Sequence, residues 1–261
     1  MSLRRSTLQI ASLIVGTTVL VTAQPAAAGG QYVVLSTQPV VDELPPGKLF
    51  MPSDVINVPA GTVVTLLGED GSVNALSGPS SFVVTEDALA YGSLQGTPNA
   101  NEGPSKLGLI AVLLANERKR TESIGGSRTT TDHSTPSGLD DPWAVSIEES
   151  APGCIRDGEM VLARAGIGQS AVFSIRIGSS EPLDGIVWSA GKPTYSLPDP
   201  IPPEVRSVVV ETSKTSASIE IKRFPKNAVL ENSLEVLGWM VSSGCKRQAL
   251  ALVRQLVTKK Q

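Results

Sequence analysis

The stretch VINVPAGTVVTLLGEDGSVNALSGPSSFVV, residues 55–84, decides the fold of the N-terminal part of the chain. Short runs rich in β-branched residues alternate with turn signals, which is typical of strands joined by tight connections. The pair Asp70-Gly71 stands between two apolar runs and indicates a hairpin, because glycine tolerates the positive φ that such turns demand. With an earlier strand at 32–35 and a turn at 44–47, residues 29–90 are predicted to form a small β module.

The order of strands and turns in 55–84 resembles that of FecR-like exported β modules, in which a strand, a turn ending in Asp-Gly and a second strand recur. The resemblance covers about 30 residues and implies a β architecture. Such modules occur in signalling and envelope proteins alike, so no functional residue is carried over.

Before this module, the N-terminal residues have the pattern of an export signal. Arg4 and Arg5 precede an uncharged apolar run over residues 8–23, which is followed by small residues at Ala26 and Ala28. The run falls short of the roughly 20 residues that a membrane-spanning helix needs. We predict a signal peptide over residues 1–28, with Ala23 as the second choice of cleavage site and an uncleaved anchor as the alternative. The adjacent arginines leave Sec and twin-arginine export both open, and we treat the signal as Sec-type.

Composition argues against nucleic acid as a partner. Residues 29–261 carry 20 basic and 25 acidic side chains, a net charge near −5, whereas phosphate backbones select for clustered Lys and Arg. The 24 glycines and 19 prolines favour many short strands joined by turns. Aromatic residues make up only 4% of the chain, which disfavours a platform for stacking sugars or bases.

Residues 91–140 are expected to be a loop, a helix and a flexible linker. From Ser105 to Arg120 apolar residues recur at helical spacing, with Ser105 as the N-cap and basic residues at the end, where a helix favours cations. We expect this helix to pack on a flanking β unit. A helix that meets a membrane surface or a partner is the alternative.

Residues 141–261 are predicted to form an antiparallel β-sandwich-like domain closed by a C-terminal helical hairpin. The expected strands are 144–147, 160–164, 171–177, 186–189, 205–210 and 216–221. The expected core consists of Trp143, Phe173, Ile175, Trp188, Val208, Val210, Ile219 and Ile221. Two helical stripes follow, separated by Gly244: Leu230, Leu234, Leu237 and Val241, then Ala249, Leu252, Val253 and Leu256. The fold class is therefore mainly β.

The two cysteines, Cys154 and Cys245, are predicted to form a disulfide that joins the start of this domain to its helices. Each follows a glycine, so each lies at a turn. Export leads to a compartment in which cysteines oxidise. Two unpaired buried thiols are the alternative.

No catalytic, cofactor or metal site is predicted. The only histidine, His133, lies in the Ser/Thr-rich linker, whereas a catalytic base needs a rigid and partly buried setting. One histidine and two distant cysteines cannot supply a zinc site. The sequence also lacks a nucleophile elbow, a P-loop and a dinucleotide fingerprint.

Carboxylate pairs offer the strongest enzymatic alternative. Glu148-Glu149 and Asp140-Asp141 could serve glycoside cleavage, but neighbouring acids on a strand point to opposite faces, so we expect them on the solvated surface. Asp70 and Asp184 each precede a glycine and are interpreted as turn residues, with calcium ligation as the remote alternative. Residues 166–168 are interpreted as a turn.

These features favour a non-enzymatic periplasmic or secreted protein that binds another protein or an envelope component, with no stable membrane span after signal cleavage. A hydrolase that uses a carboxylate pair and a structural envelope spacer are the alternatives. The second half, with Asp141-Pro142-Trp143 and its two Gly-Cys pairs, is similar to uncharacterised exported bacterial proteins, a resemblance that implies no activity. The binding partner and the oligomeric state stay open.

Overall fold

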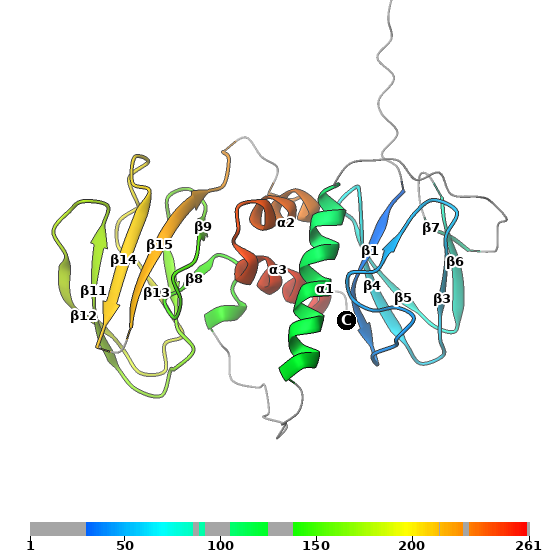
Figure 1. The fold of residues 1–261 in the computed structure, drawn as a ribbon, viewed down its shortest axis with the longest axis horizontal. Coiled ribbons are helices and arrows are strands. Elements are labelled where there is room, and N and C mark those ends of the chain that lie inside the picture. Colours follow the sequence, from blue (N-terminus) through cyan, green and yellow to red (C-terminus); the bar gives the residue numbers. More distant parts are fainter. Residues whose placement is uncertain are drawn as a thin grey trace, which may run out of the picture.

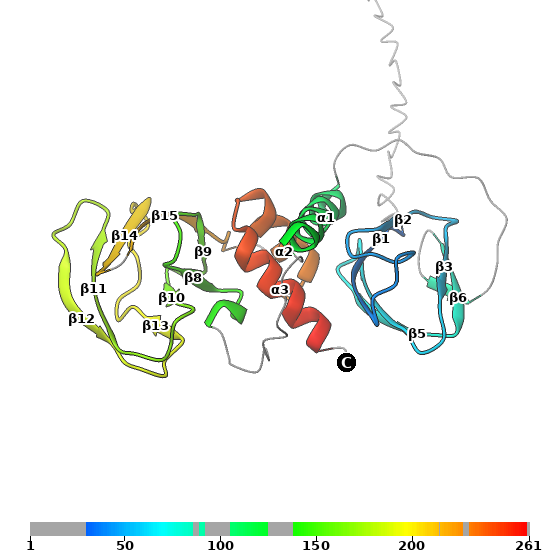
Figure 2. The ribbon, with the colours of Figure 1, turned by 60° about the horizontal axis from the view of Figure 1, so that its bottom comes forward.

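Two β units lie on either side of a layer of three helices (Figures 1 and 2). The computed structural model describes residues 30–85, 89–91, 105–124, 138–213, 215–226 and 230–259. The fold is mainly β with a C-terminal helical pair, as the sequence predicts. Strand pairing is antiparallel except at two parallel pairs in the second β unit, which the expected antiparallel domain did not include.

The N-terminal unit contains two antiparallel sheets. Their strand orders are β2-β1-β4-β5 and β3-β6-β7. The strands are β1 (Tyr32–Gln38), β2 (Leu49–Phe50), β3 (Val55–Val58), β4 (Val63–Gly68), β5 (Val73–Ser77), β6 (Ser80–Val84) and β7 (Leu89–Tyr91). The predicted Asp70-Gly71 hairpin is the connection between β4 and β5, and Gly71 has a φ of +84°.

The second β unit also contains two sheets. Their orders are β13-β10-β8 and β12-β11-β14-β15-β9, and both are mixed, because β8 runs parallel to β10 and β9 parallel to β15. The strands are β8 (Ala144–Ser146), β9 (Gly153–Ile155), β10 (Val161–Ala163), β11 (Ala171–Ile177), β12 (Leu183–Trp188), β13 (Thr194–Ser196), β14 (Ser207–Thr212) and β15 (Ser216–Arg223). A 3₁₀ turn, η1 (Gly138–Asp140), precedes them.

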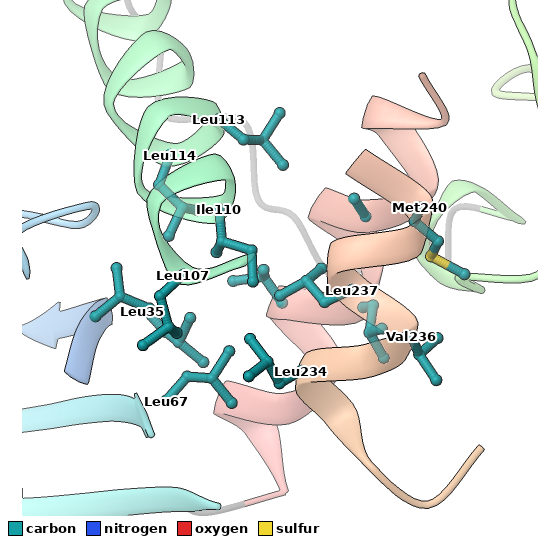
Figure 3. Close-up of a cluster of buried hydrophobic side chains, with 14 of the residues drawn as sticks. Leu35, Leu67, Leu107, Ile110, Leu113, Leu114, Leu234, Val236, Leu237 and Met240 are labelled. Carbon is teal, nitrogen blue, oxygen red and sulfur yellow. The ribbon is translucent and has the colours of Figure 1, made fainter. Parts of the chain in front are cut away.

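The three helices are α1 (Lys106–Ile124), α2 (Ser233–Ser242) and α3 (Lys246–Thr258). They share a hydrophobic core with strand β1 and the end of β4, as Figure 3 shows for Leu35, Leu67 and Leu107. The helical pair therefore does more than close the second β unit, because it also packs against α1 and the N-terminal unit.

Strand β1 explains this arrangement. Tyr32 and Val34 point into the core of the N-terminal unit, whereas Val33 and Leu35 belong to the core around the helices. Because successive side chains of a strand face opposite sides, the continuous apolar run at 32–35 buries both faces of the strand. The N-terminal unit thus has no solvated face at residues 32–35 of this strand.

Several local predictions are confirmed, and some need correction. The Ser105 hydroxyl accepts a hydrogen bond from the backbone N–H of Gly108 (3.1 Å), as an N-cap does. Trp143 packs at the edge of the helical core, not in the core of the second β unit. Leu230 is exposed and precedes α2, so it does not belong to the first helical stripe. Strands β9 and β13, of three residues each, were not anticipated.

Candidate functional site

The predicted disulfide is present and lies at the junction between the second β unit and the helices. Cys154 in β9 is bonded to Cys245, the residue before α3, with 5.9 Å between their Cα atoms. Both cysteines are buried in the core that contains the helices and β1. The disulfide therefore fastens an edge strand of the five-stranded sheet to the helical layer.

Gln248, in the first turn of α3, completes this junction. Its Oε1 accepts a hydrogen bond from the Cys154 N–H (2.8 Å), and its Nε2 donates to the Cys154 carbonyl (2.8 Å) and to the Pro142 carbonyl (3.1 Å). The residue is 5% exposed. One side chain thus provides the hydrogen-bond partners of the Cys154 backbone groups at the edge of β9. The backbone of α3 could not provide them in this way, because the backbone groups of a helix bond to one another. Sequence reasoning missed Gln248, because nothing in the sequence shows which backbone groups its amide meets.

The other end of the helical layer contacts the N-terminal unit. Asn232 caps α2 by accepting hydrogen bonds from Leu234 and Glu235, and its Nδ2 donates to the carbonyl of Asp70 (3.4 Å). Lys106 at the start of α1 pairs with Glu235 of α2. The β4–β5 turn therefore lies against the N-terminus of α2.

Electrostatics at this turn affect Tyr32. Burial raises the pKa of the Tyr32 hydroxyl above its usual 10.0, and the negative charge of Asp70 raises it further. Asp70 accepts a hydrogen bond from the Ser72 N–H (2.9 Å), which confirms its interpretation as a turn residue.

The carboxylate pairs do not converge on a common point. Glu148 accepts a hydrogen bond from the Ala165 N–H (2.9 Å), while Glu149 lies 3.5 Å from Arg247. Asp141 accepts from the Trp143 N–H (2.9 Å). Asp140 instead lies 3.6 Å from Arg254 of α3. Asp141 thus supports a local turn, Glu148 bonds the loop after β10, and Glu149 and Asp140 lie beside arginines of α3.

The remaining candidates also lie apart. Asp184 is exposed within β12, beside Gly185 with a φ of +70°, so its interpretation as a turn residue is wrong. Residues 166–168 form a loop between β10 and β11. His133 lies outside the described residues. Within the described ranges, no group of three His, Cys, Asp or Glu side chains could hold a metal ion.

The outer face of β11 and β12 exposes apolar side chains. Val172 and Val187 stand directly opposite each other and are 58% and 61% exposed. Their neighbours Phe173 and Trp188 are buried, so the two valines point away from the core. β12 is the edge strand of its sheet and lies at the end of the molecule farthest from the helices (Figure 1). We call Val172 and Val187 the edge valines.

No protein-family model matches this chain, and the comparisons with curated proteins and with solved structures found no match. In the described part of the chain, none of the helices is long and apolar enough to cross a membrane.

Proposed function

We propose that this chain is an exported protein, periplasmic or secreted, that works without enzymatic chemistry by binding another protein or an envelope component. The edge valines carry the binding part of the proposal. They form an apolar pair on the outward face of the sheet, Val187 on the edge strand β12 and Val172 on its neighbour β11. Proteins commonly protect the edge of a sheet with charges or with a covering element.

Export is supported by two independent features. The first is the signal-peptide pattern of residues 1–28. The second is the buried Cys154–Cys245 disulfide, a bond that persists in compartments outside the reducing cytosol. The FecR-like resemblance of residues 55–84 agrees with an exported protein and stays part of the proposal.

The fold suits a binding protein that presents a surface at a fixed position. The disulfide and Gln248 fasten the second β unit to the helices, and the contact of Asn232 with Asp70 does the same for the N-terminal unit. Because the two β units are joined through one layer, a partner bound at β12 would be held at a defined distance from the N-terminal unit.

The test is retention of a partner from an envelope extract of the native host by the immobilised chain, residues 29–261. We expect the double variant Val172→Ser with Val187→Ser to lose a partner that the unaltered chain retains. Leu109→Ser with Val112→Ser is the matched control, because it removes two exposed apolar side chains, 36% and 60% exposed, from α1. Equal retention by all three proteins would contradict the role of the edge valines.

A further inference from the structure

Arg164, directly after β10, is a buried cation without an anionic partner among the residues that the structure describes. Only 5% of its surface is exposed, and its Nη2 donates one hydrogen bond, to the carbonyl of Ser189 (2.9 Å). Its guanidinium lies over the ring of Trp188, 4.9 Å from the ring centre. Its Nε is buried and has no acceptor in the structure.

This arrangement leaves the buried charge of the guanidinium only partly compensated, with its Nε donor unpaired. A guanidinium has five N–H donors, and removing it from water is costly unless those donors and the charge are compensated. The contact with Trp188 offsets only part of that cost. Arg247 and Arg254 differ, because each lies within ion-pair distance of a carboxylate. Arg164 forms no such pair with any residue that the structure describes.

Two loops adjoin Arg164. Loop 165–169 follows it directly in the chain, and loop 189–193 contains the Ser189 and Pro193 carbonyls, which accept hydrogen bonds from its Nη2 (2.9 Å) and its backbone N–H (3.2 Å). They are joined by hydrogen bonds from the Gly191 N–H to the Ile167 carbonyl (2.8 Å) and from the Trp188 indole to the Lys192 carbonyl (2.9 Å). A Cβ atom added at Gly166, Gly168 or Gly191 would meet no atom within 4 Å. The loops are therefore fixed to each other, and their three exposed glycines leave the loop backbones accessible to a ligand from solvent.

We propose that Arg164 anchors an oxyanion-binding site between loops 165–169 and 189–193, which takes a carboxylate or phosphate group. The guanidinium supplies directed donors that match such a group, and the exposed Lys192 in the second loop adds a positive charge. Glu148 accepts a hydrogen bond from the Ala165 N–H of the first loop, and its negative charge is the one that would oppose an incoming anion. This site is distinct from the edge valines, so it goes beyond the proposed function and does not depend on it.

The experiment follows the indole N–H signals of the chain from Gly29 by ¹H–¹⁵N NMR during titration with inorganic phosphate and, separately, with acetate at constant ionic strength. The sequence has only three tryptophans, and the Trp188 signal reports on the ring under Arg164. We expect a saturable shift of the Trp188 signal with at least one probe, and the tighter probe identifies the group that the site prefers.

Arg164→Met should abolish this saturable shift, and Arg164→Lys should weaken it by roughly tenfold, because lysine keeps the charge but not the planar fork. Arg176→Met is the control, since Arg176 is an exposed arginine on β11 and its loss should change nothing. If Arg164→Met does not fold, Arg164→Lys decides. The proposal is overturned if the unaltered chain shows only a linear drift of all three signals, or if the lysine variant binds as tightly as the unaltered chain.

Discussion

Gln248 makes with Cys154 both backbone hydrogen bonds that a neighbouring strand would make, one to the N–H and one to the carbonyl, each 2.8 Å long. The amide of a helical side chain thus takes the place of a strand at the edge of the five-stranded sheet. The same cysteine is bonded covalently to the residue before that helix, so β9 and α3 are joined twice within one turn of the helix.

We expect Gln248→Leu to lower the free energy of unfolding by about 2–4 kcal/mol, because it leaves three buried backbone groups without partners. Urea unfolding of the purified chain measures this. Gln255→Leu is the matched control, since Gln255 is exposed on the same helix and its substitution should cost little. A similar loss for both variants would show that the hydrogen bonds of Gln248 contribute little.

Replacing both cysteines by alanine should lower the free energy of unfolding by roughly 3–5 kcal/mol. The bond links residues 91 positions apart, so its removal restores many conformations to the unfolded chain. Thermal unfolding followed by circular dichroism measures the change. Detection of two free thiols in unfolded, unreduced protein from the exporting host would contradict the pairing.

Gly71→Ala should destabilise the chain more than Gly61→Ala. Both glycines have positive φ, which costs an L-residue about 1–2 kcal/mol. A Cβ at Gly71 would also lie 2.2 Å from Oδ1 of Asn232, whereas a Cβ at Gly61 meets nothing within 4 Å. Asn232 could move aside only by giving up its cap on α2, a further loss of about 1 kcal/mol.

A double-mutant cycle tests this explanation. With Asn232→Ala in the background, the extra cost of Gly71→Ala over Gly61→Ala should disappear, because the clash is gone. If the full difference between Gly71→Ala and Gly61→Ala remains in that background, the contact with Asn232 at the start of α2 does not cause it.

The alkaline limit of stability should depend on Tyr32. Its pKa is raised in the folded chain, chiefly by burial and secondarily by Asp70, so above pH 10 the unfolded chain loses this proton more readily than the folded one. The contribution of Tyr32 is therefore complete below pH 10 and is lost as the pH rises through the folded pKa.

Urea unfolding as a function of pH compares Tyr32→Phe with the unaltered chain. The variant should lose less stability above pH 10, and Asp70→Asn should recover only the smaller part of the effect. Parallel pH profiles for all three proteins would show that Tyr32 does not titrate in this way.

The N-terminus of the exported protein is expected at Gly29, directly after Ala28. Mass spectrometry of protein recovered from the native host measures it. Recovery of an intact species beginning at Met1 in the membrane fraction would indicate an uncleaved anchor.

The sequence by itself determined the features that arise from neighbouring residues. The hairpin at Asp70-Gly71, the cap at Ser105 and the helix end at Gly244 follow from the conformations that these residues prefer, and all three are confirmed. The disulfide could be predicted because two cysteines allow only one intramolecular pairing.

Only the tertiary structure decided which faces meet. The apolar run at 32–35 predicted a strand, but not that Val33 and Leu35 would pack against helices more than 70 residues away in the chain. Strands β9 and β13 were missed because a three-residue segment carries almost no periodic signal, and its partner comes from a distant part of the chain. For the same reason the role of Gln248 and the isolation of Arg164 could not be predicted, since each depends on which backbone groups and charges the folded chain brings within hydrogen-bonding distance.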